Sequence, residues 1–94
     1  MIGVLTHHWA EKDKVENARH ILDGNGEAQR KAPGFISRTT LLSKRDPTQI
    51  SSLVVWESDH IYDKWKESDE RAKAMKNAAV VWSRPPESER FDIP

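Results

Sequence analysis

The sequence predicts an α+β domain in which two helices cover one face of a four-stranded antiparallel sheet, in the order βαββαβ. Three observations lead to this fold class. The hydrophobic period switches between about two and about 3.6 residues along the 94-residue chain. Turn-forming sequences separate the periodic segments, and the connections between them are short. This order is that of the ferredoxin-like arrangement, and the length suits one domain, residues 1–94.

The first strand and first helix are predicted from the N-terminal third. Residues 1–9, MIGVLTHHW, favour a strand because β-branched and aromatic residues are common and alternate side chains face opposite ways. A helical period starts at Asp13 and continues to about Leu22. DGNG at 23–26 is typical of turns and predicts a break or kink before a second helical piece at 27–32.

A hairpin is predicted next. Its parts are a turn at 33–34, a strand at 35–43, a turn at 44–49 centred on Asp-Pro, and a strand at 50–58. Four consecutive apolar residues, 53–56, make the last strand apolar on both faces, so something must pack on each face. An isologous dimer that presses two sheets together would cover the face that the helices leave open.

The second helical region begins at Ser58. Its apolar stripe has spacings of 4, 3, 4, 3 and 4 and consists of Ile61, Trp65, Ser68, Ala72, Met75 and Ala79. A capping sequence at 68–70 leaves two alternatives, one bent helix or two helices. Pro85-Pro86 is predicted to end regular structure, and 88–93 predicts a short final strand.

Composition limits the partners. Fifteen basic and fifteen acidic residues are interspersed, so we expect neither a nucleic-acid nor a membrane partner. The absence of cysteine excludes disulfides, thiolate chemistry and Cys-ligated metals. The longest apolar run, 78–82, is far too short to cross a bilayer, and 1–10 lack a signal-peptide pattern. We therefore expect a cytoplasmic protein.

The first strand ends in two histidines. His7 and His8 are adjacent on a strand and so point to opposite faces, which prevents both from chelating one metal ion. One of them is a candidate proton acceptor in a cavity, because histidine titrates near neutrality. The alternative is a histidine at the surface or in an interface. No metal site is expected, since His20 and His60 belong to other elements.

Two aromatic residues and one arginine are further candidates. Tyr62 and Trp65 are three apart on a helix and share a flank. Either they pack in the core, or Trp65 lines a pocket for an aromatic ligand while the Tyr62 hydroxyl donates a hydrogen bond. Arg38 lies in an apolar strand, where it either pairs across the sheet, our first interpretation, or holds an anionic or phenolate oxygen. Trp82 would cover the cavity mouth or reach a partner subunit.

Two stretches carry a family resemblance. APGFISRTTLLSKRDP (32–47) has a Pro-Gly-aromatic entry to a strand, and SLVVWESDHIYDKWKESDE (52–70) contains W-E-S followed by Y-x-x-W-x-x-S. The chain resembles the antibiotic biosynthesis monooxygenase (ABM) family over most of 1–83. The resemblance implies a dimeric α/β-barrel. The family includes cofactor-independent oxygenases of polycyclic phenols, haem-degrading enzymes and small-molecule isomerases.

The resemblance also implies a cavity between helices and sheet, lined by a tryptophan that matches Trp65. Haem-degrading members use a histidine ten residues after that tryptophan and an asparagine in the first strand. This chain has Met75 at the first position and no asparagine in 1–16. These departures put haem degradation in doubt. Haem binding through the Met75 thioether or a strand histidine is kept as an alternative.

The sequence thus predicts a cofactor-independent monooxygenase for a small aromatic or quinol-like substrate, with no bound metal or cofactor. The partners expected are that small molecule and a second copy of the chain. The candidate catalytic residues are Tyr62, His7 and His8, and the candidate substrate-binding residues are Trp65, Arg38 and Met75. The alternative from another class is a non-catalytic binding or assembly dimer. A helix–sheet space filled by side chains such as Leu22 would favour that alternative.

Overall fold

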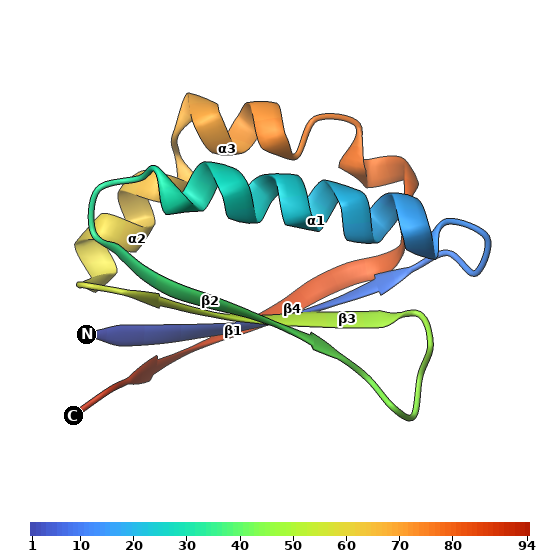
Figure 1. Cartoon of the computed structure of the whole chain (residues 1–94), viewed down its shortest axis with the longest axis horizontal. Coiled ribbons are helices and arrows are strands. Elements are labelled where there is room, and N and C mark those ends of the chain that lie inside the picture. The colour runs from blue at the N-terminus through green and yellow to red at the C-terminus, as the bar shows by residue number, and fades with distance from the viewer.

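The computed structural model describes residues 1–94 as one antiparallel sheet with all helices on one face (Figure 1). The elements are β1 (Ile2–Ala10), α1 (Val15–Arg30), β2 (Phe35–Leu42), β3 (Gln49–Trp56), α2 (Asp59–Lys66), α3 (Asp69–Ala74), a 3₁₀ turn (Ala78–Val80) and β4 (Trp82–Asp92). The strand order β2-β3-β1-β4 confirms the ferredoxin-like fold. None of the helices has the length and apolar character needed to cross a membrane.

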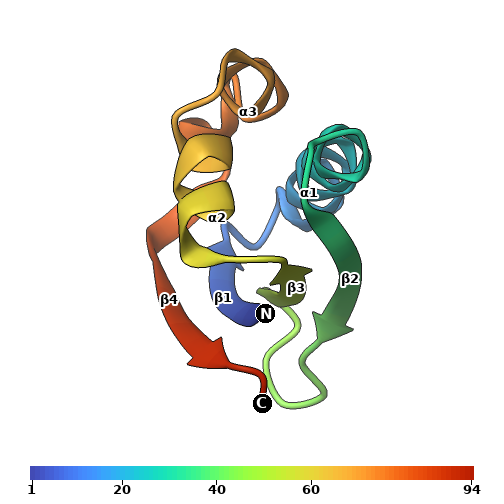
Figure 2. The ribbon, with the colours of Figure 1, turned by 90° about the vertical axis from the view of Figure 1, so that its left-hand side faces the viewer.

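The helices divide the covered face between them. Figure 2 shows α1 above β2 and β3, while α2 and α3 lie above β1 and β4. Two apolar clusters form the core. One is built around Trp56 and Trp65, and the other around Leu22 and Ile50. Polar side chains of the sheet, including Ser52, lie between the two clusters, and this is where the site described below is found.

The predicted break at 23–26 is wrong, because α1 continues through this sequence to Arg30. Local propensity favours a turn there, but burial against β2 outweighs it. Asn25 and Gly26 both lie on the buried face of the helix. A Cβ atom at Gly26 would come within 2.8 Å of the Cδ and Nε atoms of Arg38, so the glycine makes room for the arginine.

The second helical region consists of two helices, as one of the two alternatives predicted. The Ser58 hydroxyl accepts the Ile61 N–H at 3.3 Å and begins α2. The Ser68 hydroxyl accepts the Arg71 N–H at 3.2 Å and begins α3, while it donates to the Trp65 carbonyl at 2.7 Å. Ser68 thus ends one helix and starts the next.

The prediction for Pro85-Pro86 is also wrong, because β4 runs through both prolines and is longer than the strand expected at 88–93. The reason is its place in the sheet. β4 is an edge strand, and an edge strand tolerates residues that cannot donate a ladder hydrogen bond. The pairing with β1 shifts register between His7 and Ala10, beside the prolines.

The face of the sheet without helices carries a group of apolar side chains, which we call the open face. The register places on it Leu5, Leu41, Leu53, Val55 and Phe91. Leu53, Leu41 and Phe91 are 37%, 44% and 44% exposed. The predicted dimer would cover this face. The structure describes a single chain, so the dimeric barrel stays a prediction.

Candidate functional site

A cavity of about 350 Å³ lies between the three helices and the sheet, and we call it the inner cavity. Its apolar lining is Val4, Leu22, Val54, Trp65, Met75 and Pro86. Its polar lining is Thr6, His8, Asn25, Gln29, Arg38, Ser52, Tyr62, Lys66, Arg71, Ser88 and Arg90. The space between helices and sheet is therefore not filled by side chains.

Five of the six candidate residues from the sequence line this cavity, and they come from four elements. His8 comes from β1, Arg38 from β2, Tyr62 and Trp65 from α2, and Met75 from the end of α3. The sixth, His7, lies outside it on the opposite face of the sheet. There its Nδ1 atom is hydrogen-bonded to the Ser51 hydroxyl at 2.6 Å.

His8 has an environment that keeps its imidazole neutral. Its ring lies 4.8 Å from the Trp82 ring, centroid to centroid, and its buried Nδ1 has no hydrogen-bond partner within the protein. Burial, followed by the positive charges of Arg38, Arg71 and His7, lowers the pKa of His8 to about 4. At neutral pH, His8 is therefore able to accept a proton from a bound molecule.

Arg38 points beneath α1 rather than across the sheet. Its Nη1 donates to the Gln29 side-chain oxygen at 2.7 Å, and its Nη2 donates to the Leu22 carbonyl at 3.3 Å. Its cross-strand neighbour on β3 is Val54, which is apolar. Our first interpretation of Arg38, pairing across the sheet, is therefore wrong, and neutral groups of α1 hold the guanidinium at the cavity wall.

An aromatic wall lines the α2 side of the cavity. The Trp65 ring stacks on Trp56 at 5.9 Å, and the Tyr62 ring lies 5.9 Å from Trp56. Burial raises the pKa of the Tyr62 hydroxyl, and the nearby charges of Arg90 and Arg71 only partly offset the rise. The Tyr62 hydroxyl therefore stays protonated at neutral pH and is able to donate a hydrogen bond.

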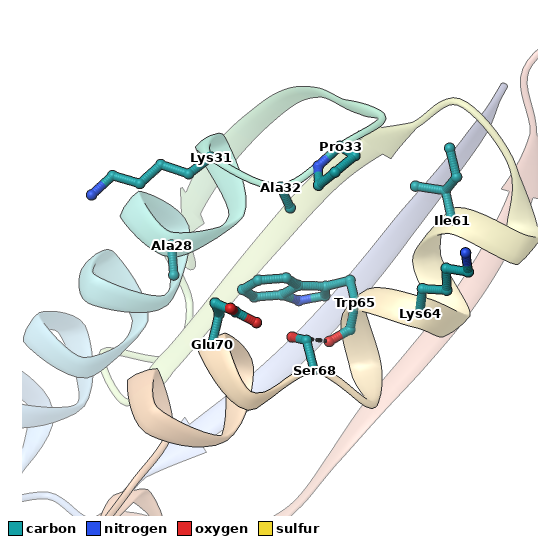
Figure 3. Close-up of a pocket in the computed structure, with 9 residues that line it drawn as sticks. All are labelled: Ala28, Lys31, Ala32, Pro33, Ile61, Lys64, Trp65, Ser68 and Glu70. Carbon is teal, nitrogen blue, oxygen red and sulfur yellow. Dashed lines mark hydrogen bonds between the residues drawn. The ribbon is translucent and has the colours of Figure 1, made fainter.

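A second and larger hollow, of about 560 Å³, opens between the end of α1 and the start of α3, and we call it the outer groove. Figure 3 shows the Trp65 indole as its floor, so Trp65 contacts both hollows. The charged residues of the groove are Lys31, Lys64 and Glu70, all exposed. The groove contains no histidine, tyrosine or arginine, so the candidate reactive groups belong to the smaller inner cavity.

Eight polar residues of the inner cavity were not among the candidates predicted from the sequence: Thr6, Asn25, Gln29, Ser52, Lys66, Arg71, Ser88 and Arg90. The Asn25 Oδ1 atom is buried without a hydrogen-bond partner within the protein. Asn25 and Gln29 continue the helical spacing of the buried stripe that starts with Ala18 and Leu22. That spacing would have predicted Asn25 and Gln29 on the buried face of the helix, but the predicted break at 23–26 interrupted the helical pattern.

The donor set for a metal ion or haem is small. No group of three or more His, Asp or Glu side chains comes together to hold a metal ion. The side chains of the cavity with atoms that ligate haem iron are the Met75 thioether, the His8 imidazole and the Tyr62 hydroxyl. They belong to three different elements, the end of α3, β1 and α2.

Comparison with known proteins places the chain in a family. The family model described as antibiotic biosynthesis monooxygenase, ABM, matches residues 1–77. No protein with a curated description matches. A solved structure from Nitrosomonas europaea is 18% identical, with a TM-score of 0.88 over 98% of this chain and 97% of that one. Rv0793 from Mycobacterium tuberculosis is 15% identical, with a TM-score of 0.88 over 99% and 94%.

SnoaB, a cofactor-independent oxygenase from Streptomyces nogalater, is 10% identical, with a TM-score of 0.87 over 99% of this chain and 92% of that one. At such identities the structural likeness shows a shared fold. The family model covers most of the chain, including β1, α1, the hairpin, α2 and α3. The chain belongs to the antibiotic biosynthesis monooxygenase family.

Proposed function

We propose that this protein is a cofactor-independent monooxygenase that oxidises a small phenol in the inner cavity. The observation that carries the proposal is an open cavity in which the neutral imidazole of His8 and the aromatic wall of Tyr62 and Trp65 line the same space. Membership of the family and the fold shared with SnoaB, a cofactor-independent oxygenase, support it.

Binding comes first. A planar aromatic substrate packs against the part of the Trp65 side chain that lines the inner cavity, and stacking on Trp56 fixes the orientation of the indole. The Tyr62 hydroxyl donates a hydrogen bond to a substrate oxygen. The cavity volume, about 350 Å³, lies at the small end of the range for ligand pockets and suits a molecule of two fused rings.

Proton transfer follows. His8 accepts the proton of the substrate hydroxyl, which leaves a phenolate and an imidazolium in contact. A phenol has a pKa of about 10 in water, and His8 has a pKa of about 4. Without other interactions, the proton transfer is therefore unfavourable by about six pKa units. The positive charges of Arg38 and Arg71 at the cavity stabilise the phenolate and reduce that cost.

The phenolate then gives electrons to O₂ within the cavity. The overall reaction converts one phenol and one O₂ into one quinone and one water. The substrate loses one hydrogen from its hydroxyl, one from a ring carbon and four electrons in all. One oxygen atom of O₂ becomes the new carbonyl, and the other leaves as water. No external reductant is needed for this balance.

Oxygen uptake with 1-naphthol tests the proposal. We expect one O₂ consumed for each 1,4-naphthoquinone formed. In His8→Ala, kcat/KM falls at least about a hundredfold because the proton acceptor is lost. His20→Ala, a histidine exposed on α1, is the matched control and keeps full activity. Uptake no faster than in protein-free solution would overturn the proposal, and saturable naphthol binding without uptake would favour the non-catalytic binding dimer.

We also propose that the active form is a homodimer in which the open faces of two sheets pack together. Apolar side chains on this face, such as Leu53 and Phe91, are partly exposed in the single chain. Burying them would remove an apolar surface that a monomer leaves in water. The dimer places the inner cavities on the outer sides of the paired sheets, so each subunit keeps its own site.

A further inference from the structure

We propose that the inner cavity selects a hydroxyaryl carboxylate, whose carboxylate binds the guanidinium of Arg38 with Arg71 as the second cation. The inference rests on the proposed function, in which the substrate is a phenol, and it names the additional group that this phenol carries. Arg38 approaches the cavity from β2 and Arg71 from α3, so the two cations come from opposite sides of the site.

The charge of the cavity lining is one-sided. Four lining side chains are cationic, Arg38, Lys66, Arg71 and Arg90, and none is aspartate or glutamate. Arg90 is already neutralised by Asp59 at 2.9 Å and Asp63 at 2.7 Å.

The other cations lack such partners. The five ion pairs of the structure involve Arg19, Arg30, Arg84 and Arg90, and none includes Arg38 or Arg71. Lys66 is exposed, with its ammonium 5.7 Å from the Tyr62 ring centroid. Arg38 and Arg71 are therefore the half-buried cations that a ligand anion would neutralise.

Arg38 is held in place with donors to spare. Two of its N–H groups bond to the Gln29 side chain and the Leu22 carbonyl. A guanidinium has five N–H donors, and three of those of Arg38 make no hydrogen bond within the protein. A carboxylate matches this planar donor set better than a neutral oxygen does. Gly26 leaves the space through which the Arg38 side chain reaches Gln29.

Two carboxylates on the outer side of Arg38 have other partners. Asp23 and Glu27 of α1 line a shallow surface groove together with Arg38 itself. Asp23 pairs with Arg19 at 3.2 Å, and Glu27 pairs with Arg30 at 3.8 Å. Neither carboxylate lines the inner cavity or forms an ion pair with Arg38.

Acceptors lie in the same cavity and suit the hydroxyl of such a ligand. The Oδ1 atom of Asn25 and the Nδ1 atom of His8 are buried, and neither has a hydrogen-bond partner within the protein. A buried acceptor without a partner is costly, so a ligand hydroxyl is a favourable occupant. A carboxylate for Arg38 and a hydroxyl for these acceptors together describe a hydroxyaryl carboxylate.

Binding of 1-hydroxy-2-naphthoate and of its methyl ester, measured by calorimetry, tests the inference. The two probes differ in the carboxylate charge and by one methyl group. We expect the acid to bind at least about tenfold more tightly than the ester at low salt, with the difference shrinking as salt rises. Arg38→Gln and Arg71→Gln should each weaken acid binding by about ten- to a hundredfold and change ester binding less than about twofold.

Arg45→Gln is the matched control. It removes an exposed positive charge from the β2–β3 loop, outside the cavity, and should change neither affinity. Equal affinities for acid and ester would overturn the inference, as would equal losses for both probes in the cavity variants. No acid binding at about 1 mM would overturn it too. If Arg38→Gln does not fold, Arg71→Gln carries the test, because Arg71 lies on a short surface helix.

The experiments can reject the proposed function and the proposed selectivity for a carboxylate independently of each other. Acid that binds through Arg38 without oxygen uptake would keep the selectivity and reject the oxygenase. Oxygen uptake with 1-naphthol and no preference for acid over ester would keep the oxygenase and reject the selectivity.

Discussion

The imidazole of His8 lies between the Trp82 ring and a cavity that holds Arg38 and Arg71. Burial removes water that would solvate an imidazolium, and the two guanidinium groups repel its charge. Both effects keep the ring neutral at pH values where an exposed histidine is already protonated. His8 therefore adds a pH dependence to folding as well as a proton acceptor to the site.

Replacing His8 should remove part of the acid sensitivity of the fold. An unfolded His8 takes up a proton near pH 6.5, whereas the folded one does so only near pH 4. Between these values the unfolded state binds more protons, so the free energy of unfolding falls as the pH falls, by roughly 3 kcal/mol in total. In His8→Gln this contribution is absent. Urea unfolding at about pH 7.5 and 4.5 measures both proteins.

Carboxylates titrate over the same range, so the comparison between wild type and variant is what counts. The wild type should lose more stability than His8→Gln on acidification. An equal loss in both proteins would mean that His8 is not held neutral by its surroundings.

At single positions, the sequence predicted which side chains line the cavity but not their hydrogen-bond partners. Alternation along β1 separates His7 from His8, and the cavity does receive only one of them. The hydrogen-bond partner of Arg38 could not be predicted from the strand, because that partner, Gln29, is on another element. The cross-strand neighbour of Arg38 is the apolar Val54. Strand periodicity tells which residues share a face and says nothing about the helix laid on that face.

Helix α1 shows how two glycines of one motif serve different purposes. Gly24 is exposed, and a Cβ atom there would meet nothing within 4 Å. Gly26 is buried, and a Cβ atom there would collide with the Arg38 side chain. Glycine in a helix interior costs about 1 kcal/mol relative to alanine. At Gly24 nothing in the fold offsets this cost, whereas at Gly26 it is offset by the position of Arg38.

Two alanine variants separate these roles. Gly24→Ala should raise the free energy of unfolding by about 0.5–1 kcal/mol and leave ligand binding unchanged. Gly26→Ala should gain less stability and should weaken binding of 1-hydroxy-2-naphthoate about tenfold, because the Arg38 guanidinium is displaced. Urea unfolding and calorimetry on both variants check this. Equal acid affinity in the two variants would contradict the role given to Gly26.

Strands, hairpin and caps were predictable because their signals are local. The Ser58 and Ser68 caps and the alternation of β1 need no knowledge of distant residues. The errors arose where position in the fold overrides local propensity. DGNG stays helical because β2 packs on it, and Pro85-Pro86 stays in a strand because that strand is at the edge of the sheet.

The domain has two faces of different character. Figures 1 and 2 show that α1, α2 and α3 cover one face of its sheet. The inner cavity lies on this face. The other is the open face. Leu53 lies near its centre, on β3, the strand between β1 and β2. Only 36% of the residues are hydrophobic, so a single chain has a small core and a partly exposed apolar sheet.

Charge placed on the open face should separate the proposed dimer. The wild type should sediment at twice the chain mass of 10.8 kDa at micromolar concentration, and Leu53→Asp at the chain mass, because a carboxylate cannot be buried between two sheets. Leu42→Asp is the matched control, since Leu42 is 58% exposed and lies on the other face of the sheet. Sedimentation of the wild type as a monomer would reject the dimer.

A crystal structure with 1-hydroxy-2-naphthoate bound tests most directly that the space between helices and sheet is the binding site. We predict the aromatic rings against Trp65 in the inner cavity and a carboxylate oxygen about 3 Å from a guanidinium nitrogen of Arg38. Ligand density confined to the outer groove or to the open face, with none in the inner cavity, would contradict this assignment.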